Sequence, residues 1–514
     1  MSIRFLLRSF YIYSFVVLLG GPNPFEPLHA PYSQGVRWTS PQTIPGLNLE
    51  SIPPILIADQ NRTVHAFSSQ WLDLADGSAV KAIVYNQWTL DHGWSEPIDI
   101  LLSPIYEARV TDVYLDAKGI LHLVFFGGNS ISADIYYSHA SLASADDVRS
   151  WSPPILVGEK ASDPESAVIT QNDQGDLSII FYGHKNGNGL YVINSNDEGN
   201  NWTEPVPFFL TSDDKPNIFA LQTIKSESGW LHTVWALYSR EGQGRGIYYS
   251  RSRNGKDWDE PIVLADAQEG LGTQTPTIIE NKGELFVVYN LTPKLTMQRS
   301  MDDGNTWLDP VTLFKRHVGV NGTLSMVNDG NDGLHLFFGQ RITGNPDIHG
   351  MWHSEWINER WSEPEAVVKG PRIVDKVGNN GFDPYDAQAI ISQGNVILVT
   401  WRTDPGDIKE NGVWYSSATL DIPELPVIPP LAFPITNIHP SSILAQTNSS
   451  GKPTLTPIPV EILSEINQLP QQVKNGYVQN NPTALILIGV ISVLAFLVII
   501  FVYRFLIKSR RNSL

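Results

Sequence analysis

Two stretches of the chain carry one turn pattern: Ser195-Asn196-Asp197-Glu198-Gly199-Asn200-Asn201-Trp202 and Ser300-Met301-Asp302-Asp303-Gly304-Asn305-Thr306-Trp307. Both fit Ser-x-Asp-x-Gly-x-x-Trp. Short Ser and Asp side chains bond to the backbone of a tight turn, glycine accepts a positive φ, and Trp packs a large ring beneath the hairpin. The pattern therefore predicts a structural β-hairpin at each place. The residues predicted to build these turns are Ser195, Asp197, Gly199, Trp202, Ser300, Asp302, Gly304 and Trp307.

Each of these tryptophans also belongs to a longer repeat, in which Trp is followed three residues later by Pro. The seven copies stand at Trp38, Trp94, Trp151, Trp202, Trp258, Trp307 and Trp361. Short runs rich in β-branched and aromatic residues separate them, such as Ile120–Phe125 and Trp230–Trp235. A period of about 50 residues with several strands per unit is typical of a β-propeller, whose sheets bury their faces only against one another. We therefore expect an all-β, seven-bladed propeller.

The ends of the repeat are out of phase. The last unit, residues 382–421, has the pattern of three strands but no Trp-x-x-Pro, whereas Val36–Thr43 has the Trp strand with no strand before it. A ring closed by pairing these two fragments would remove an exposed sheet edge. We therefore predict that Val36–Thr43 pairs as the outer strand beside Gly412–Ala418.

The turn pattern is that of the Asp-box, or BNR repeat, and residues 35–421 resemble the sialidase-like propeller superfamily. Ser252–Trp258 is similar to a third box shortened by one residue. In that family the boxes are structural hairpins away from the central pocket, so the resemblance implies a structural role for Asp197 and Asp302. Catalytic sialidases of the family are six-bladed, which leaves a six-bladed sialidase-type ring as the alternative. Seven-bladed propellers of this kind include sugar-binding lectins.

The resemblance also implies what a catalytic site would need. Three arginines clamp the substrate carboxylate, an Asp serves as acid and base, and a Tyr activated by a Glu is the nucleophile. The family's first arginine lies in a Phe/Tyr-Arg-Ile-Pro motif before the first blade, and Asn48–Pro54 holds no arginine at this place. The candidate catalytic residues at strand ends near the channel are Arg109, Arg341, Arg402, Asp112, Tyr385 and Asp386. The alternative is that Arg341 and Arg402 are surface residues, paired with Asp347 and with Asp404 or Asp407.

Four histidines occupy equivalent places on predicted second strands: His65, His122, His232 and His335. Propeller pseudo-symmetry holds such positions apart, and no metal-ligand spacing accompanies them. We therefore expect packed, hydrogen-bonded core histidines, and neither a metal site nor a cofactor.

Both ends of the chain carry segments typical of membrane targeting. Arg4 and Arg8 precede an apolar run, which predicts a signal peptide or signal anchor within residues 1–30. Residues 484–506 predict a transmembrane helix, and the basic tail 507–514 places the C-terminus in the cytoplasm. The Pro-rich segment 422–482 predicts a stalk. Together they predict a single-pass cell-membrane protein with the propeller outside the cell.

Composition limits the expected cellular location and the classes of partner. The 514 residues include no cysteine, which in an ectodomain favours a bacterial cell-surface protein. A formal net charge of -18 argues against nucleic acid or an anionic membrane surface as a partner. We expect a propeller that recognises glycans or another cell-surface ligand. An exo-α-sialidase with a degenerate or relocated arginine clamp is one alternative, and a structural or adhesive protein-interaction propeller is another.

Overall fold

The computed structural model describes residues 35–47, 51–74, 77–105, 107–129, 133–161, 167–211, 217–239, 244–266, 273–291, 294–317, 322–340, 349–369, 384–403 and 412–427. All of them lie in one compact unit, Met1–Ala432. No helix within these ranges is long and apolar enough to cross a membrane. The predicted signal segment 1–30, transmembrane segment 484–506, tail 507–514 and most of the stalk lie outside the described residues.

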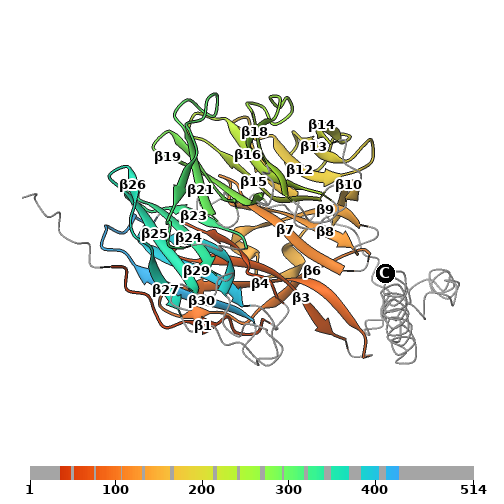
Figure 1. The fold of residues 1–514 in the computed structure, drawn as a ribbon. Helices are drawn as coiled ribbons and strands as arrows, with labels where there is room; N and C mark the ends of the chain where they lie inside the picture. The colour runs from red at the N-terminus through yellow and green to blue at the C-terminus, as the bar shows by residue number, and fades with distance from the viewer. Residues whose placement is uncertain are drawn as a thin grey trace, which may run out of the picture. The chain divides into compact units, whose positions relative to one another are not determined.

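The described strands form seven antiparallel blades (Figure 1), which confirms the all-β, seven-bladed prediction and shows that the six-bladed alternative was wrong. Blade 1 contains β2 (Ile55–Ala58), β3 (Val64–Asp73), β4 (Ala79–Thr89), β5 (Gly93–Trp94) and β6 (Ile98–Leu102). Blade 2 contains β7 (Glu107–Leu115), β8 (Ile120–Gly128), β9 (Ala133–Ser141) and β10 (Ile155–Ala161), with two short 3-10 helices, Leu142–Ser144 and Val148–Ser150, before β10. Blade 3 contains β11 (Ala167–Gln171), β12 (Leu177–Gly183), β13 (Gly189–Ser195) and β14 (Val206–Leu210).

The other four blades repeat this order. Blade 4 contains β15 (Asn217–Lys225), β16 (Leu231–Tyr238), β17 (Gly244–Ser252) and β18 (Ile262–Asp266), and blade 5 contains β19 (Thr273–Asn281), β20 (Glu284–Leu291), β21 (Lys294–Ser300) and β22 (Val311–Leu313). Blade 6 contains β23 (Ser325–Asn328), β24 (Leu334–Gln340), β25 (Gly350–Ile357), β26 (Arg360–Trp361) and β27 (Glu365–Lys369). Blade 7 contains β28 (Pro384–Ser392), β29 (Val396–Thr403), β30 (Val413–Thr419) and, from the N-terminus, β1 (Gln42–Thr43).

The ring closes through blade 7, as the phase offset predicts. Strand β1 pairs with β30, with Gln42 opposite Tyr415 and Thr43 opposite Trp414. The strand is shorter than the predicted Val36–Thr43, but Thr39 extends the contact, because its N–H donates to the Ser417 carbonyl at 2.9 Å. The outer edge of the last blade is thus covered by the start of the propeller.

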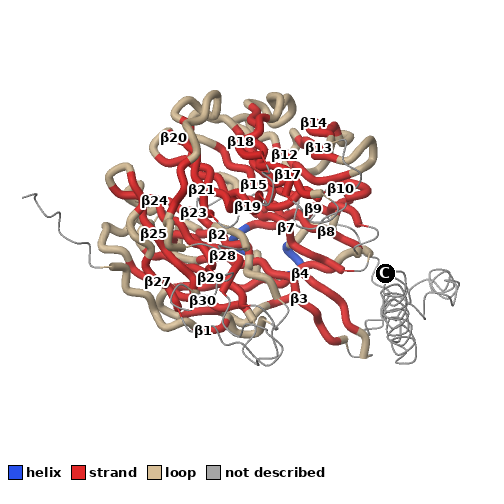
Figure 2. Tube along the Cα trace, viewed as in Figure 1, coloured by secondary structure: helices blue, strands red, loops and turns tan. Residues whose placement is uncertain are grey.

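Most of the core lies between neighbouring blades. Phe67 of blade 1 packs with Phe125 of blade 2, and Leu56 of blade 1 packs with Leu398 of blade 7. Phe67 and Phe125 are fully buried, and burying such a side chain stabilises a fold by about 1.5–3 kcal/mol. Each blade covers the apolar faces of its neighbours, so the blades form one ring. Their innermost strands surround its centre (Figure 2).

Candidate functional site

A cavity of about 820 Å³ lies at the centre of the ring, and the innermost strands of all seven blades line it. Ile55 comes from β2, Val168 from β11, and the other five strands contribute several residues each. Among the described residues that line the cavity, the ones able to carry charge at neutral pH are Asp112, Asp386 and Arg402. Concave sites with a few converging polar groups are the usual places for ligands.

Three sequence-predicted residues converge at the blade 7 side of this cavity. Arg402 donates from Nε to Asp386 Oδ2 at 2.7 Å. Its guanidinium also lies over the Tyr385 ring, 4.6 Å from the ring centre. Arg402 and Asp386 are partly exposed, with 31% and 18% of their side chains accessible. The pair therefore remains open to a ligand, although the tyrosine ring and the carboxylate hold the guanidinium in place.

A β-bulge aims Asp386 at the arginine. Tyr385 lies opposite Arg402 in the β28–β29 ladder, and the register then shifts before Gln388. Asp386 takes φ 57, a left-handed conformation that costs a non-glycine residue energy and is often found at functional sites. Thr323 of blade 6 stabilises the bulge, because its N–H donates to Asp386 Oδ1 at 2.9 Å.

A glycine lets blade 6 approach this bulge. Gly322 has φ 83, and a Cβ atom on it would lie 2.7 Å from both the nitrogen and Oδ1 of Asp386. Any larger residue would push the carboxylate away from Arg402. The position of Asp386 therefore depends on two blades, which no local pattern in the sequence reveals.

Asp112 lies in the same cavity and links blades 2 and 3. Its Oδ2 accepts the Ile169 N–H at 2.8 Å, and its Oδ1 accepts the Val113 N–H at 2.9 Å. Burial raises the pKa of Asp112 to about 7, against the opposite effect of these two hydrogen bonds. At neutral pH this side chain can therefore hold or release a proton inside the cavity.

The other predicted arginines are not placed with this group. Arg109 is not among the described residues lining the cavity; it donates to Glu107 Oε2, from Nε at 3.1 Å and from a terminal nitrogen at 2.8 Å. Arg341 lies outside the described residues, as do Asp404 and Asp407, the partners considered for Arg402. The described part of the cavity thus holds one arginine of the three in the predicted clamp.

The sequence did not single out the residues equivalent to Asp112 on other innermost strands. Gln222 accepts the Ile278 N–H of the next blade at 3.1 Å, and Ser325 accepts the Ala389 N–H at 3.0 Å. Both line the cavity. Their residue types differ, so only their shared place in the repeat could have shown that they belong together.

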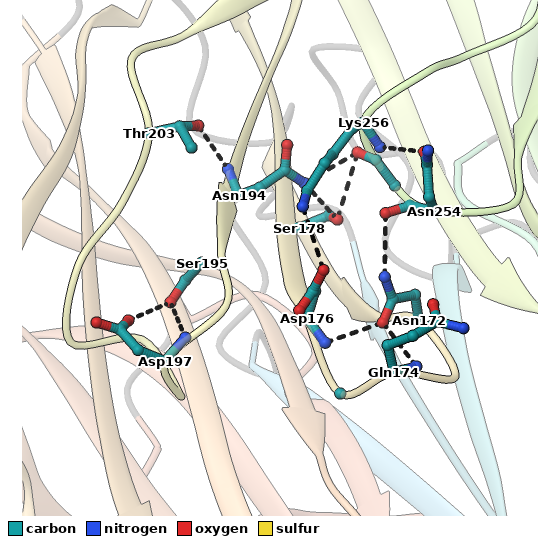
Figure 3. A network of polar contacts seen from close by, with 12 residues as sticks. Asn172, Gln174, Asp176, Ser178, Asn194, Ser195, Asp197, Thr203, Asn254 and Lys256 are labelled. Atoms are coloured by element: carbon teal, nitrogen blue, oxygen red, sulfur yellow. Dashed lines mark hydrogen bonds and ion pairs between the residues drawn. The ribbon is translucent and has the colours of Figure 1, made fainter.

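The two complete Asp-boxes form the predicted turns. Ser300 Oγ donates to Asp302 Oδ1 at 2.9 Å and accepts the Gly304 N–H at 2.8 Å. Figure 3 shows the same bond between Ser195 and Asp197, at 2.8 Å. Each box glycine has a positive φ and lies against a tyrosine of the preceding blade: Gly199 against Tyr137 and Gly304 against Tyr249. The boxes therefore join neighbouring blades.

The shortened box in blade 4 also joins neighbouring blades, but through different atoms (Figure 3). Asn254 stands where the full boxes have Asp, and its side-chain oxygen accepts from Ser252 Oγ at 3.2 Å. Its carbonyl accepts from Asn172 of blade 3 at 3.1 Å, and Lys256 pairs with Asp176 at 3.3 Å.

The four strand-two histidines are buried and hydrogen-bonded, as predicted. His65, His122 and His232 each bond through Nδ1 to the hydroxyl of a tyrosine on the neighbouring strand at 2.6 to 2.7 Å, and His335 bonds to His353 at 2.9 Å. Their side chains are 0 to 3% exposed, which places them in the core of four separate blades. The expected lack of a metal or cofactor stays a prediction.

Comparison with known families agrees with this geometry. Residues 75–329 match the family model of the BNR repeat-like domain. The chain is a sialidase-like, BNR-repeat β-propeller. A search of curated protein sequences found no relative of this propeller.

Several solved structures are similar to the BNR propeller at low sequence identity. A protein of unknown function from Dyadobacter fermentans is 14% identical, covers 75% of this chain and 100% of its own, and has a TM-score of 0.44. A PL25 ulvan lyase is 13% identical, with 74% and 95% covered and a TM-score of 0.45. A mutant of NanB sialidase from Streptococcus pneumoniae is 11% identical, with 74% and 94% covered and a TM-score of 0.38. At this level of similarity, none of them decides what this propeller binds.

Proposed function

We propose that this BNR propeller recognises a glycan in its central cavity. The observation that carries the proposal is the group formed by Tyr385, Asp386 and Arg402 at the cavity wall. A guanidinium and a carboxylate side by side offer donors and acceptors to neighbouring sugar hydroxyls, and the buried Tyr385 ring holds the guanidinium in place for them.

The proposal includes a place at the cell surface. The apolar segment 484–506 would anchor the chain, the Pro-rich stretch 422–482 would hold the propeller away from the bilayer, and residues 1–30 would direct export. An external glycan would then reach the cavity without crossing the membrane.

Glycoside hydrolysis is the second candidate, and Asp112 is the observation that favours it. A carboxyl group with a pKa of about 7 keeps its proton at slightly acidic pH and can donate it to a leaving group. Against this, Asp112 already accepts two backbone N–H bonds, and the described cavity offers one arginine to a substrate carboxylate. Recognition without turnover is therefore the primary proposal.

The test uses the full chain purified in detergent, applied to an array of immobilised glycans. Arg402→Ala should reduce binding about tenfold or more, because hydrogen bonds to a charged group contribute about 1.5–3 kcal/mol. Arg109→Ala removes the same charge away from the cavity lining and is the matched control. Binding that is unchanged in Arg402→Ala, or the absence of any bound glycan, would contradict the proposed site and favour a protein-interaction propeller.

The hydrolase candidate is tested on the same samples with a fluorogenic α-sialoside. We expect no release of the fluorophore above the buffer rate. Release that Asp112→Asn and Tyr385→Phe both abolish, in proteins with an unchanged melting temperature, would instead establish an enzyme.

A further inference from the structure

Building on the proposed glycan site, we infer that the cavity selects an uncharged sugar over an anionic one such as a sialic acid or a uronic acid. The inference comes from the charges that line the cavity and from the way its arginine is held.

The described lining has no surplus of positive charge. Arg402 is the one cationic side chain among the described lining residues, and Asp112 and Asp386 are the two acidic side chains among them. Even with Asp112 protonated, the arginine and Asp386 neutralise each other. A sugar carboxylate would therefore meet described lining residues that carry no net positive charge to offset the hydration it loses.

Arg402 is also already paired with a carboxylate that is fixed in place. Asp386 is held by the 2.7 Å bond to Arg402, by the Thr323 N–H at 2.9 Å and by the left-handed bulge. An anionic ligand would compete with a tethered carboxylate whose effective concentration is very high. A sugar hydroxyl, by contrast, both donates and accepts, so it can bond to both members of the pair without separating them.

The rest of the lining suits hydroxyl groups. Uncharged polar side chains come from five of the blades: Thr111, Gln222, Thr275, Thr323, Ser325 and Gln388. Thr323 Oγ1 is buried and has no hydrogen-bond partner among the described residues, directly beside the backbone N–H that binds Asp386. Phe219 and Tyr238 add aromatic surface, with ring centres 6.4 Å apart and the rings nearly perpendicular. Neutral hydrogen-bonding groups in a lining that also includes aromatic surface favour an uncharged pyranose.

The test compares matched glycan pairs that differ only in a terminal sialic acid or a glucuronic acid, bound by the full chain. We expect the neutral member of each pair to bind at least about tenfold more tightly, because the free-energy cost of binding an unpaired charge corresponds to about this ratio of affinities or more. Its affinity should change little between about 0.05 and 0.5 M NaCl, because an uncharged ligand is not screened.

Asp386→Asn is the decisive variant. Asn keeps an oxygen for the Thr323 N–H and tolerates a positive φ, but it releases Arg402 from its carboxylate. The variant should lose affinity for the neutral glycan and gain affinity for the acidic one, which shifts the preference about 10- to 100-fold toward the acidic member. Arg109→Ala should leave the preference as in the wild type.

Each failure has its own meaning. Wild-type preference for acidic glycans, with loss of binding in Arg402→Ala, would overturn this inference and keep the proposed function. An unchanged preference in a folded Asp386→Asn protein would also overturn it. If Asp386→Asn fails to fold, the wild-type preference and its salt dependence decide the matter alone. Failure of every glycan to bind would overturn the proposed function together with the inference.

Discussion

Replacing the glycine of the second Asp-box should uncouple two blades. Gly304→Ala places a methyl group at φ 77, and its Cβ atom would lie 1.8 Å from Tyr249 Oη. The left-handed backbone costs about 1–2 kcal/mol for an L-residue, and the overpacking adds about 1–3 kcal/mol. Tyr249 would have to move, which breaks its 2.7 Å bond to His232 and its edge contact with Trp307. We therefore expect the free energy of unfolding to fall by about 2–5 kcal/mol.

Gly283→Ala is the matched control for this prediction. Gly283 has φ 78, nearly the same as Gly304, but no atom lies within 4 Å of a Cβ atom built there. It should therefore lose only the backbone contribution of about 1–2 kcal/mol. Urea unfolding followed by tryptophan fluorescence gives both values. Equal losses in the two variants would refute the view that the box glycine is needed for packing against the preceding blade.

Three more predictions follow from the same structure. Asp302→Ala removes three hydrogen bonds at a solvent-exposed turn and should lower stability by roughly 1 kcal/mol without changing glycan binding; lost binding at an unchanged melting temperature would mean that the box belongs to the ligand site. The pKa of Asp112 is raised to about 7, so the folded protein holds a proton that the unfolded chain releases above about pH 4, and the stability from Asp112 is lost as the pH rises toward 7. Melting curves should therefore show wild type losing stability relative to Asp112→Asn between these pH values, and parallel curves would contradict this. Deleting residues 1–45 removes β1 and the Thr39 contacts, and should lower the melting temperature strongly; an unchanged value would show that the ring does not need this closure.

Much of the fold could be predicted because its signals are local. A box such as Ser300–Trp307 specifies its own turn, because the Ser300 side chain bonds to groups two and four residues later. The number of Trp-x-x-Pro copies predicts the number of blades. Even the long-range pairing of the N-terminal strand with the last blade could be predicted, because the N-terminal fragment has only a Trp strand and the last unit lacks one.

The site was harder to predict because it depends on contacts between blades. The sequence proposed Asp404 or Asp407 as neighbours of Arg402, but the bulge in β28 brings Asp386 to it, and blade 6 fixes that bulge through Thr323. Asp112 was a candidate catalytic residue because of its place at a strand end near the channel. Its bonds to the backbone of Ile169 and Val113 accompany a register shift in the β7–β8 pairing, and no pattern of residue types predicts that shift.

The location of a bound glycan tests the central claim most directly. A crystal structure of the protein with a neutral glycan from the array should show the sugar in the central cavity, with hydroxyl groups bonded to Asp386 and Arg402. A sugar bound on the outer surface between two blades, with none in the cavity, would contradict the account.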